Sequence, residues 1–129
     1  MDVTYSPAPD GRPDPGEVVW TWVPYEDDPT QGKDRPVLLI SRAGEELIGL
    51  MLTSKDHDRE EVQEAAAGRF WFDLGAGPWD SKGRPSEVRL NRLILVDPQD
   101  VRREGSVLDP IRYDAVIAAA RPYFPPVSA

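Results

Sequence analysis

Short apolar runs, separated by loops rich in proline, glycine and charge, are the feature that most constrains how this sequence can fold. The runs are rich in valine, isoleucine, leucine and aromatic residues, a composition typical of β-strands. None of them approaches the roughly 20 apolar residues that a membrane-spanning helix needs. Strands are predicted at residues 17–23, 36–41, 47–53, 69–74 and 87–96. The pattern therefore predicts a mainly β (α+β) protein.

The burial of these strands follows from their side-chain patterns. Alternation places Val18, Trp20 and Trp22 on one face of the first strand, as in a half-buried strand. Residues 36–41 and 47–53 are apolar on both faces, and a turn-like stretch joins them. These two runs are therefore predicted to form a hairpin in the centre of the sheet.

Helix signals lie in the connections and near the end of the chain. Asp58 is predicted to cap a short helix that ends before Gly68, and His57 just before it is expected to be a solvated loop residue. Asp-Pro pairs predict a short helical turn over 97–105 and a final helix over 109–121. Ile111, Val116, Ile117 and Ala120 are expected to pack that helix on the sheet. Five strands, short connecting helices and a C-terminal helix indicate a small barrel.

The organisation predicted along the chain is a single domain between two tails. Residues 1–15 contain four prolines and little apolar surface, so they are expected to form a disordered N-terminal tail. They also lack the apolar segment of a secretory signal, which predicts a cytoplasmic location. The barrel domain is expected over 16–124, followed by a short tail at 125–129.

Two properties of the composition limit the possible functions. The chain has no cysteine, which excludes disulfides, thiolate metal sites and cysteine nucleophiles. Its net charge is −8, whereas proteins that bind nucleic acid through phosphate contacts are usually basic. An enzyme acting on RNA would therefore need a local basic site within an acidic surface.

Five segments carry a resemblance to a known family. In chain order they are G-E-V-V-W (16–20), D-P-T-Q-G (28–32), R-P-V-L-L-I-S (35–41), M-L-T-S (51–54) and S-E-V-R-L-N-R (86–92). Together they resemble the MazF/PemK toxins of type II toxin–antitoxin systems. The resemblance implies an SH3-like five-stranded barrel with a C-terminal helix, which forms a homodimer. It also implies a sequence-specific endoribonuclease that cuts single-stranded RNA by attack of the 2′-OH, uses no metal or cofactor, and is silenced by an antitoxin protein.

The resemblance also implies catalytic residues. Arg35 matches the family's active-site arginine, and a guanidinium fork suits phosphate oxygens. Thr53 matches the residue that helps to hold the scissile phosphate. Arg89 and Asn91 match a pair that supplies acid and base in some relatives. Asn91 cannot accept a proton, so either the base is another group, such as Asp28, or this member is slow, or it is not a nuclease.

Strand 87–96 supports part of this assignment on physical grounds. Alternation places Val88, Leu90, Ile94 and Val96 on one face of the strand. Arg89 and Asn91 then lie side by side on the other face, roughly 7 Å apart. Arg92 interrupts the apolar face and is expected to pair with an acid or to mark a bulge.

RNA contacts are expected from loops around these strands. The loop 75–86 contains Trp79, which could stack an unpaired base, and the cations Lys82 and Arg84, which could hold its phosphate. The other predicted RNA-binding residues are Asp28, Lys33 and Ser54. None of the acidic runs has the spacing of a calcium loop, and no metal site is predicted.

A second hypothesis remains open at this stage. The same barrel could be a non-catalytic module that binds and inhibits a protein, and the acidic charge and Asn91 favour this function. A basic cleft that gathers Arg35, Lys82, Arg84 and Arg89 would support the nuclease, whereas scattered arginines would support the binding module.

Overall fold

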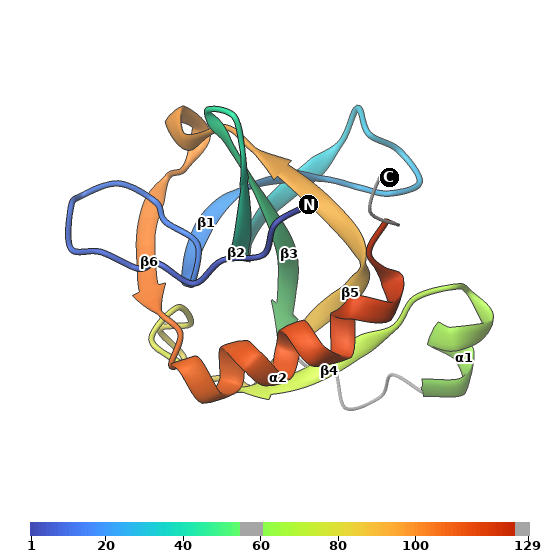
Figure 1. Ribbon diagram of the computed structural model, residues 1–129. Helices are drawn as coiled ribbons and strands as arrows, with labels where there is room; N and C mark the ends of the chain where they lie inside the picture. The colour runs from blue at the N-terminus through green and yellow to red at the C-terminus, as the bar shows by residue number, and fades with distance from the viewer. Residues whose placement is uncertain (55–60, 126–129) are drawn as a thin grey trace.

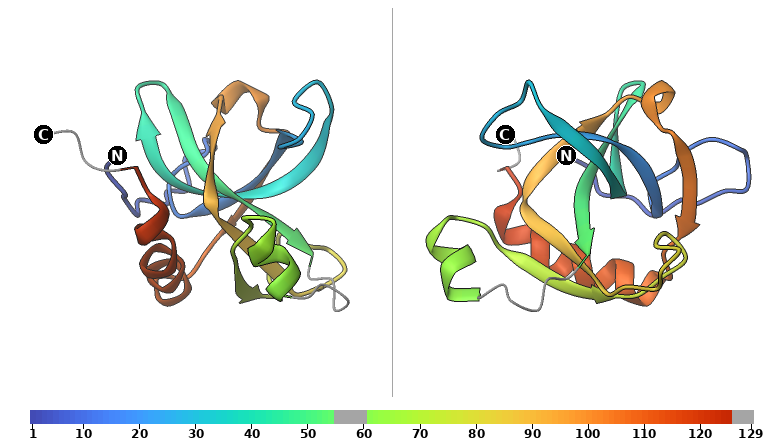
Figure 2. Two further views of the ribbon diagram at one scale, coloured as in Figure 1. Left: turned by 90° about the vertical axis from the view of Figure 1, so that its right-hand side faces the viewer. Right: turned by 180° about the vertical axis from the view of Figure 1, so that it is seen from behind.

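The computed structural model describes residues 1–54 and 61–125, in which one antiparallel sheet of six strands curls into a half-barrel (Figures 1 and 2). The strands are β1 (Glu17–Pro24), β2 (Gly32–Ala43), β3 (Glu46–Ser54), β4 (Trp71–Gly75), β5 (Ser86–Val96) and β6 (Arg103–Val107). Their order across the sheet is β4-β5-β3-β2-β1-β6. The helical elements are α1 (Glu61–Ala66), η1 (Pro98–Asp100), α2 (Pro110–Ala120) and η2 (Arg121–Tyr123). A mainly β fold with a C-terminal helix is therefore confirmed, and the curled sheet is consistent with the predicted small barrel.

The predicted number of strands is wrong, because β6 is an additional strand. The helical turn expected over 97–105 is limited to η1, where Asp97 accepts a hydrogen bond from the backbone N–H of Gln99. After Val101 the chain is extended, and β6 pairs antiparallel with β1, with Glu17 opposite Val107. Segment 103–107 has no strand pattern in its own sequence, and it forms a strand because it pairs with the edge of β1.

Both faces of the central strands are buried, as the apolar runs predicted. Neighbouring residues of one strand, such as Val18 and Val19 of β1, belong to two different hydrophobic clusters. The first cluster lies between the sheet and α2, and contains Leu38 of β2 and Leu50 of β3. The second lies on the opposite face and contains Val37 and Leu39 of β2 and Leu47 of β3. Two cores thus fix the register of the hairpin formed by β2 and β3.

The apolar face of β5 is not continuous, which corrects the alternation expected for this strand. Val88 and Leu90 belong to the first cluster, whereas Ile94 and Val96 belong to the second. The cause is an irregularity in the pairing with β3: Leu50 faces Leu93 and Leu52 faces Val88. Two steps along β3 thus correspond to five steps along β5, so the faces of β5 exchange within this stretch. As a result, Arg89 and Arg92 reach the same side of the sheet.

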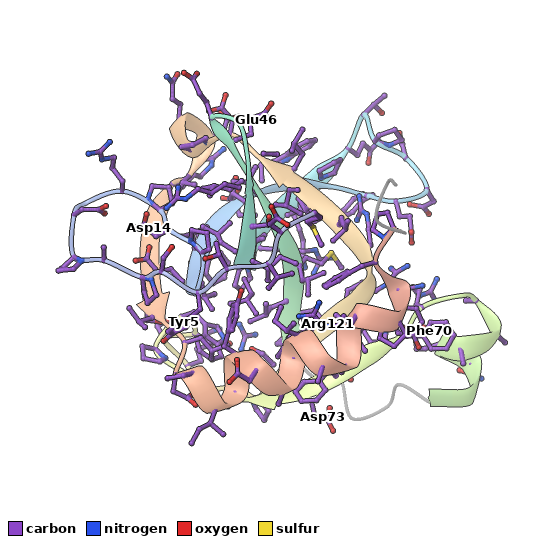
Figure 3. The ribbon with its side chains drawn as sticks, in the orientation of Figure 1. Tyr5, Asp14, Glu46, Phe70, Asp73 and Arg121 are labelled. Carbon is purple, nitrogen blue, oxygen red and sulfur yellow. The ribbon has the colours of Figure 1, made fainter. Side chains whose placement is uncertain are left out.

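Residues 1–15, expected to be a tail, lie against the barrel. Val3 forms a bridge with Ser41, and the backbone N–H of Thr4 donates to the carbonyl of Ile40 at 3.0 Å. The hydroxyl of Tyr5 donates to the carbonyl of Leu108 at 2.7 Å. Figure 3 shows Tyr5 and Asp14 on this segment, and Asp14 forms a 2.6 Å ion pair with Arg42. The prolines prevent regular structure but do not prevent packing.

Helix α2 crosses one end of the half-barrel (Figure 1). Asp109 caps it by accepting from the N–H of Arg112, with Pro110 in the first turn. Val116, Ile117 and Ala120 are buried as predicted, but Ile111 is 82% exposed because it faces away from the sheet. In the described ranges, no helix has both the length and the apolar character needed to cross a membrane.

Candidate functional site

A cleft of about 420 Å³ opens between the β1–β2 loop, the strands β3 and β5, and the segment that joins α1 to β4. It combines arginines, carboxylates and one tryptophan. The lining residues are Pro24, Tyr25, Glu26, Asp27, Arg35, Met51, Thr53, Glu64, Arg69, Trp71, Arg89 and Arg92.

Two of the predicted catalytic residues are in contact in this cleft. Arg35 lies in β2 and Thr53 near the end of β3, and Nη1 of Arg35 donates a hydrogen bond to Oγ1 of Thr53 at 3.3 Å. Both side chains are only partly buried. The contact therefore presents a cation and a hydroxyl side by side to a ligand, as phosphate binding requires.

The predicted pair on β5 is also brought together, and Asn91 holds Arg89 in place. Arg89 is 3% exposed, and its Nε donates to Oδ1 of Asn91 at 2.6 Å. Nδ2 of Asn91 donates to the carbonyl of Gly68 at 2.6 Å, which fixes the orientation of the amide. Asn91 does not line the cleft, so it is a positioning residue for Arg89.

Glu26 faces the other side of the Arg89 guanidinium. The two terminal nitrogens of Arg89 donate to the two carboxylate oxygens of Glu26, both at 3.1 Å. The hydrogen bond from Arg89 lowers the pKa of the Glu26 carboxyl below its usual value. Glu26 is 53% exposed, so a buried cation is joined to a solvent-facing anion inside the cleft.

Two further arginines complete the cationic lining. Arg92 donates through Nη2 to the carbonyl of Pro24 at 2.7 Å, which ties β5 to the end of β1. Arg69 forms a two-pronged contact with Glu64, at 2.7 Å for the shorter bond. The cleft lining thus holds four arginines against three carboxylates, a small local excess of positive charge in a chain whose net charge is −8.

A smaller cavity of about 120 Å³ lies on the other side of the Arg35–Thr53 contact. Its lining includes Lys33, Ser54 and Arg84, all predicted to bind RNA. Because Arg35 and Thr53 line both cavities, their contact lies where the two cavities meet.

Three other predicted residues lie elsewhere. Asp28 accepts hydrogen bonds from the N–H and the hydroxyl of Thr30, so it stabilises its own turn. Lys82 is exposed and lines neither cavity. Trp79, predicted to stack a base, is buried at 4% exposure, and its indole N–H donates to the hydroxyl of Ser86 at 2.9 Å, so it packs in the core.

The cleft also contains three residues that their sequence context does not mark as site residues: Glu26, Arg69 and Trp71. Glu26 stands in an acidic run that has the composition of a solvated face, and no spacing links it to Arg89. Arg69 and Trp71 flank the start of a short strand and reach the cleft only through the pairing of β4 with β5.

No metal centre accompanies the cleft in the part of the chain that the structure describes, where no three His, Asp or Glu side chains lie close enough to hold an ion. The predictions for His57 and Asp58 fall outside the described residues.

The comparisons with known proteins identify a family. No curated protein matches the chain. The family described as PemK-like, MazF-like toxin of type II toxin–antitoxin system matches residues 14–124, a range that includes all lining residues of both cavities. The chain therefore belongs to the PemK-like, MazF-like toxins of type II toxin–antitoxin systems.

Proposed function

We propose that this toxin is a sequence-specific endoribonuclease that cuts single-stranded RNA without a metal ion. The observation that carries the proposal is the Arg35–Thr53 contact, which lies where two cation-lined cavities meet. A phosphate at this point would have room for a nucleotide on either side.

The reaction is a transesterification. The ribose 2′-oxygen attacks the adjacent phosphorus, the bond to the 5′-oxygen of the next nucleotide breaks, and a 2′,3′-cyclic phosphate forms. The proton of the 2′-OH passes to a base, and the departing 5′-oxygen takes up a proton. Negative charge develops on the phosphoryl oxygens, so fixed cations around them lower the barrier.

Each predicted catalytic residue has a role in this scheme. Arg35 stabilises the charge on the phosphoryl oxygens, and Thr53 holds one of those oxygens by a hydrogen bond. Arg89 is a second cation at the reacting group, and Asn91 orients it. Lys33, Ser54 and Arg84 line the smaller cavity, where they would contact the RNA backbone.

Glu26 replaces Asp28 as our candidate for the base. It lines the cleft and lies on Arg89, whereas Asp28 accepts the hydrogen bonds of its own turn. Glu26 is ionised at neutral pH and is able to accept a proton, while the hydrogen bond from Arg89, which lowers its pKa, also makes it a weaker base.

The clustering of arginines supports the nuclease over a non-catalytic module. Of the four cations expected to form a basic cleft, Arg35 and Arg89 share it, Arg84 lines the smaller cavity and Lys82 lines neither. The cleft also gathers Arg69 and Arg92, which were not expected there. The family implies an antitoxin partner. A cytoplasmic homodimer is part of the same proposal, and mass measurement in solution tests its oligomeric state.

The test is end mapping of RNA incubated with purified wild type and with Arg35→Ala, both in the presence of chelator. We expect wild type to produce new 2′,3′-cyclic phosphate ends at a short sequence, and Arg35→Ala to lose this activity by at least about 100-fold. Arg12→Ala is the matched control, because Arg12 is exposed on the N-terminal loop. Equal cleavage by wild type and Arg35→Ala, or intact RNA with wild type, would overturn the proposal.

A further inference from the structure

A second groove, of about 370 Å³, adjoins the cleft and has an aromatic wall. Phe70 and Tyr123 stack there, with ring centroids 5.2 Å apart and planes 20° from parallel. Both rings are partly exposed, Phe70 at 36% and Tyr123 at 42%. Figure 3 shows Phe70 between α1 and the C-terminal end of α2. The remaining lining residues are Glu64, Ala65, Arg69, Trp71, Phe72, Asp73, Glu87 and Leu90.

This aromatic groove is continuous with the cleft. Glu64, Arg69 and Trp71 line both, just as Arg35 and Thr53 line the cleft and the smaller cavity. The three hollows therefore form one path along the sheet. A strand whose phosphate lies on the Arg35–Thr53 contact would extend from the cleft into the aromatic groove.

The charges along this path separate a phosphate region from a base region. The cleft is lined by four arginines and three carboxylates, whereas the aromatic groove is lined by three carboxylates and one arginine, Arg69, at the shared boundary. Asp73 and Glu87 face each other across β4 and β5 and both line the groove. These carboxylates repel phosphate but accept N–H donors, and each carboxylate can accept several hydrogen bonds.

We propose that the aromatic groove binds one unpaired nucleobase of the RNA, next to the scissile phosphate, and selects bases with an exocyclic amino group. The inference rests on the proposed function, because the cleft must hold the phosphate. The base stacks on the exposed ring of Tyr123 or Phe70, as unpaired bases do on aromatic side chains. Its amino group donates to a carboxylate of the groove. The groove therefore contributes to the sequence preference of cleavage.

The test combines Tyr123→Ala with RNA oligonucleotides that lack one base. The cut site is first mapped with wild type, and each nucleotide next to it is then replaced by an abasic residue. We expect one abasic position to lower kcat/KM of wild type by about tenfold, as loss of one stacked base does. Tyr123→Ala should lower kcat/KM by a similar factor on the intact oligonucleotide. On the abasic oligonucleotide, Tyr123→Ala should lower kcat/KM little further than the missing base already does. At the same position, adenine, cytosine or guanine should be preferred to uracil.

Two controls separate base binding from structural damage. Tyr123→Phe keeps the ring and should recover most of the cleavage that Tyr123→Ala loses, and Ile111→Ala, which removes an exposed side chain of α2 that does not line the groove, should retain wild-type cleavage. If Tyr123→Ala and the abasic losses simply multiply at every position, the groove holds no base and the proposal is overturned. If Tyr123→Ala leaves cleavage unchanged but weakens inhibition by the antitoxin, the groove is a peptide site and the proposal is again overturned.

The same cycle can be run without catalysis, which separates this inference from the proposed function. An oligonucleotide with a 2′-O-methyl group at the cut site is titrated and its Kd is measured. If wild type cuts no RNA, oligonucleotides that together contain every short sequence are titrated instead. If Tyr123→Ala raises Kd on the intact oligonucleotide but not on one with a single abasic position, the groove binds that base, even if wild type cleaves nothing. Absence of any binding to wild type overturns both proposals.

Discussion

At the scale of single residues, the cleft is organised around the guanidinium of Arg89. Its three nitrogens are divided between two partners: Nε donates to Asn91, and the two terminal nitrogens donate to Glu26. The amide of Asn91 is itself anchored on the carbonyl of Gly68. An asparagine can thus orient the guanidinium as a carboxylate would, whereas the proposed acid–base catalysis needs another group.

Replacing Glu26 by glutamine tests whether Glu26 is that group. Glu26→Gln keeps the shape but removes the proton acceptor, so kcat should fall by about 100-fold or more. KM should fall or stay unchanged, because a negative charge leaves the cleft. In wild type, the hydrogen bond from Arg89 lowers the pKa of Glu26 below its usual value, so kcat should be level near neutral pH and decline only in acid, as Glu26 becomes protonated. A variant with unchanged kcat and lower KM would show that Glu26 only competes with the substrate for Arg89.

Removing the side chain of Asn91 tests its positioning role. Asn91→Ala leaves the buried Nε of Arg89 without its acceptor, which should lower the free energy of unfolding by about 1–3 kcal/mol in urea titrations. The loss of orientation should lower kcat more than it raises KM. Asn91→Asp is the conservative comparison, since it retains an acceptor for Nε and should recover part of kcat. Equal stability of all three proteins would contradict the role.

At the scale of elements, the parts predicted from sequence are those with a strong local pattern. The central hairpin and α2 follow from apolar runs and from the Asp109–Pro110 cap. Strand β6 could not be predicted, because R-E-G-S-V has no alternation and forms a strand only by pairing with β1. The break in β5 could not be predicted either, since alternation assumes a single register. The aromatic groove joins Phe70 to Tyr123, which no local pattern connects.

Gly16 lies where the N-terminal segment packs against the start of β1, and its replacement tests that packing. Its φ of +101° is rarely adopted by other residues, and an added Cβ would lie 2.7 Å from Cδ1 of Tyr5. Gly16→Ala should therefore lower the free energy of unfolding by about 2–3 kcal/mol. Gly11→Ala is the matched control, because Gly11 has a φ of +74° but nothing lies within 4 Å of an added Cβ. It should lower the free energy of unfolding by less than Gly16→Ala does. Combining Gly16→Ala with Tyr5→Ala isolates the packing part in a double-mutant cycle. A coupling energy near zero would show that Tyr5 does not pack on this turn.

At the scale of the whole molecule, the net negative charge disfavours RNA binding everywhere except along the two cavities, where basic side chains gather. The net charge of −8 repels RNA at a distance, whereas Lys33, Arg35, Arg84, Arg89 and Arg92 attract phosphate along the two cavities. The molecule should therefore bind RNA weakly overall and depend strongly on a few contacts.

Salt dependence measures how many of these contacts form. For single strands, log K falls with log salt concentration with a slope of about −0.7 for each phosphate neutralised. If Lys33 and Arg84 each contact one phosphate, Lys33→Ala and Arg84→Ala should each make the slope shallower by about 0.7 with an uncleavable oligonucleotide. Arg12→Ala should leave the slope unchanged, because Arg12 is exposed far along the N-terminal loop and lines neither cavity. Slopes altered equally by all three substitutions would mean that overall charge, and not the basic path, governs RNA binding.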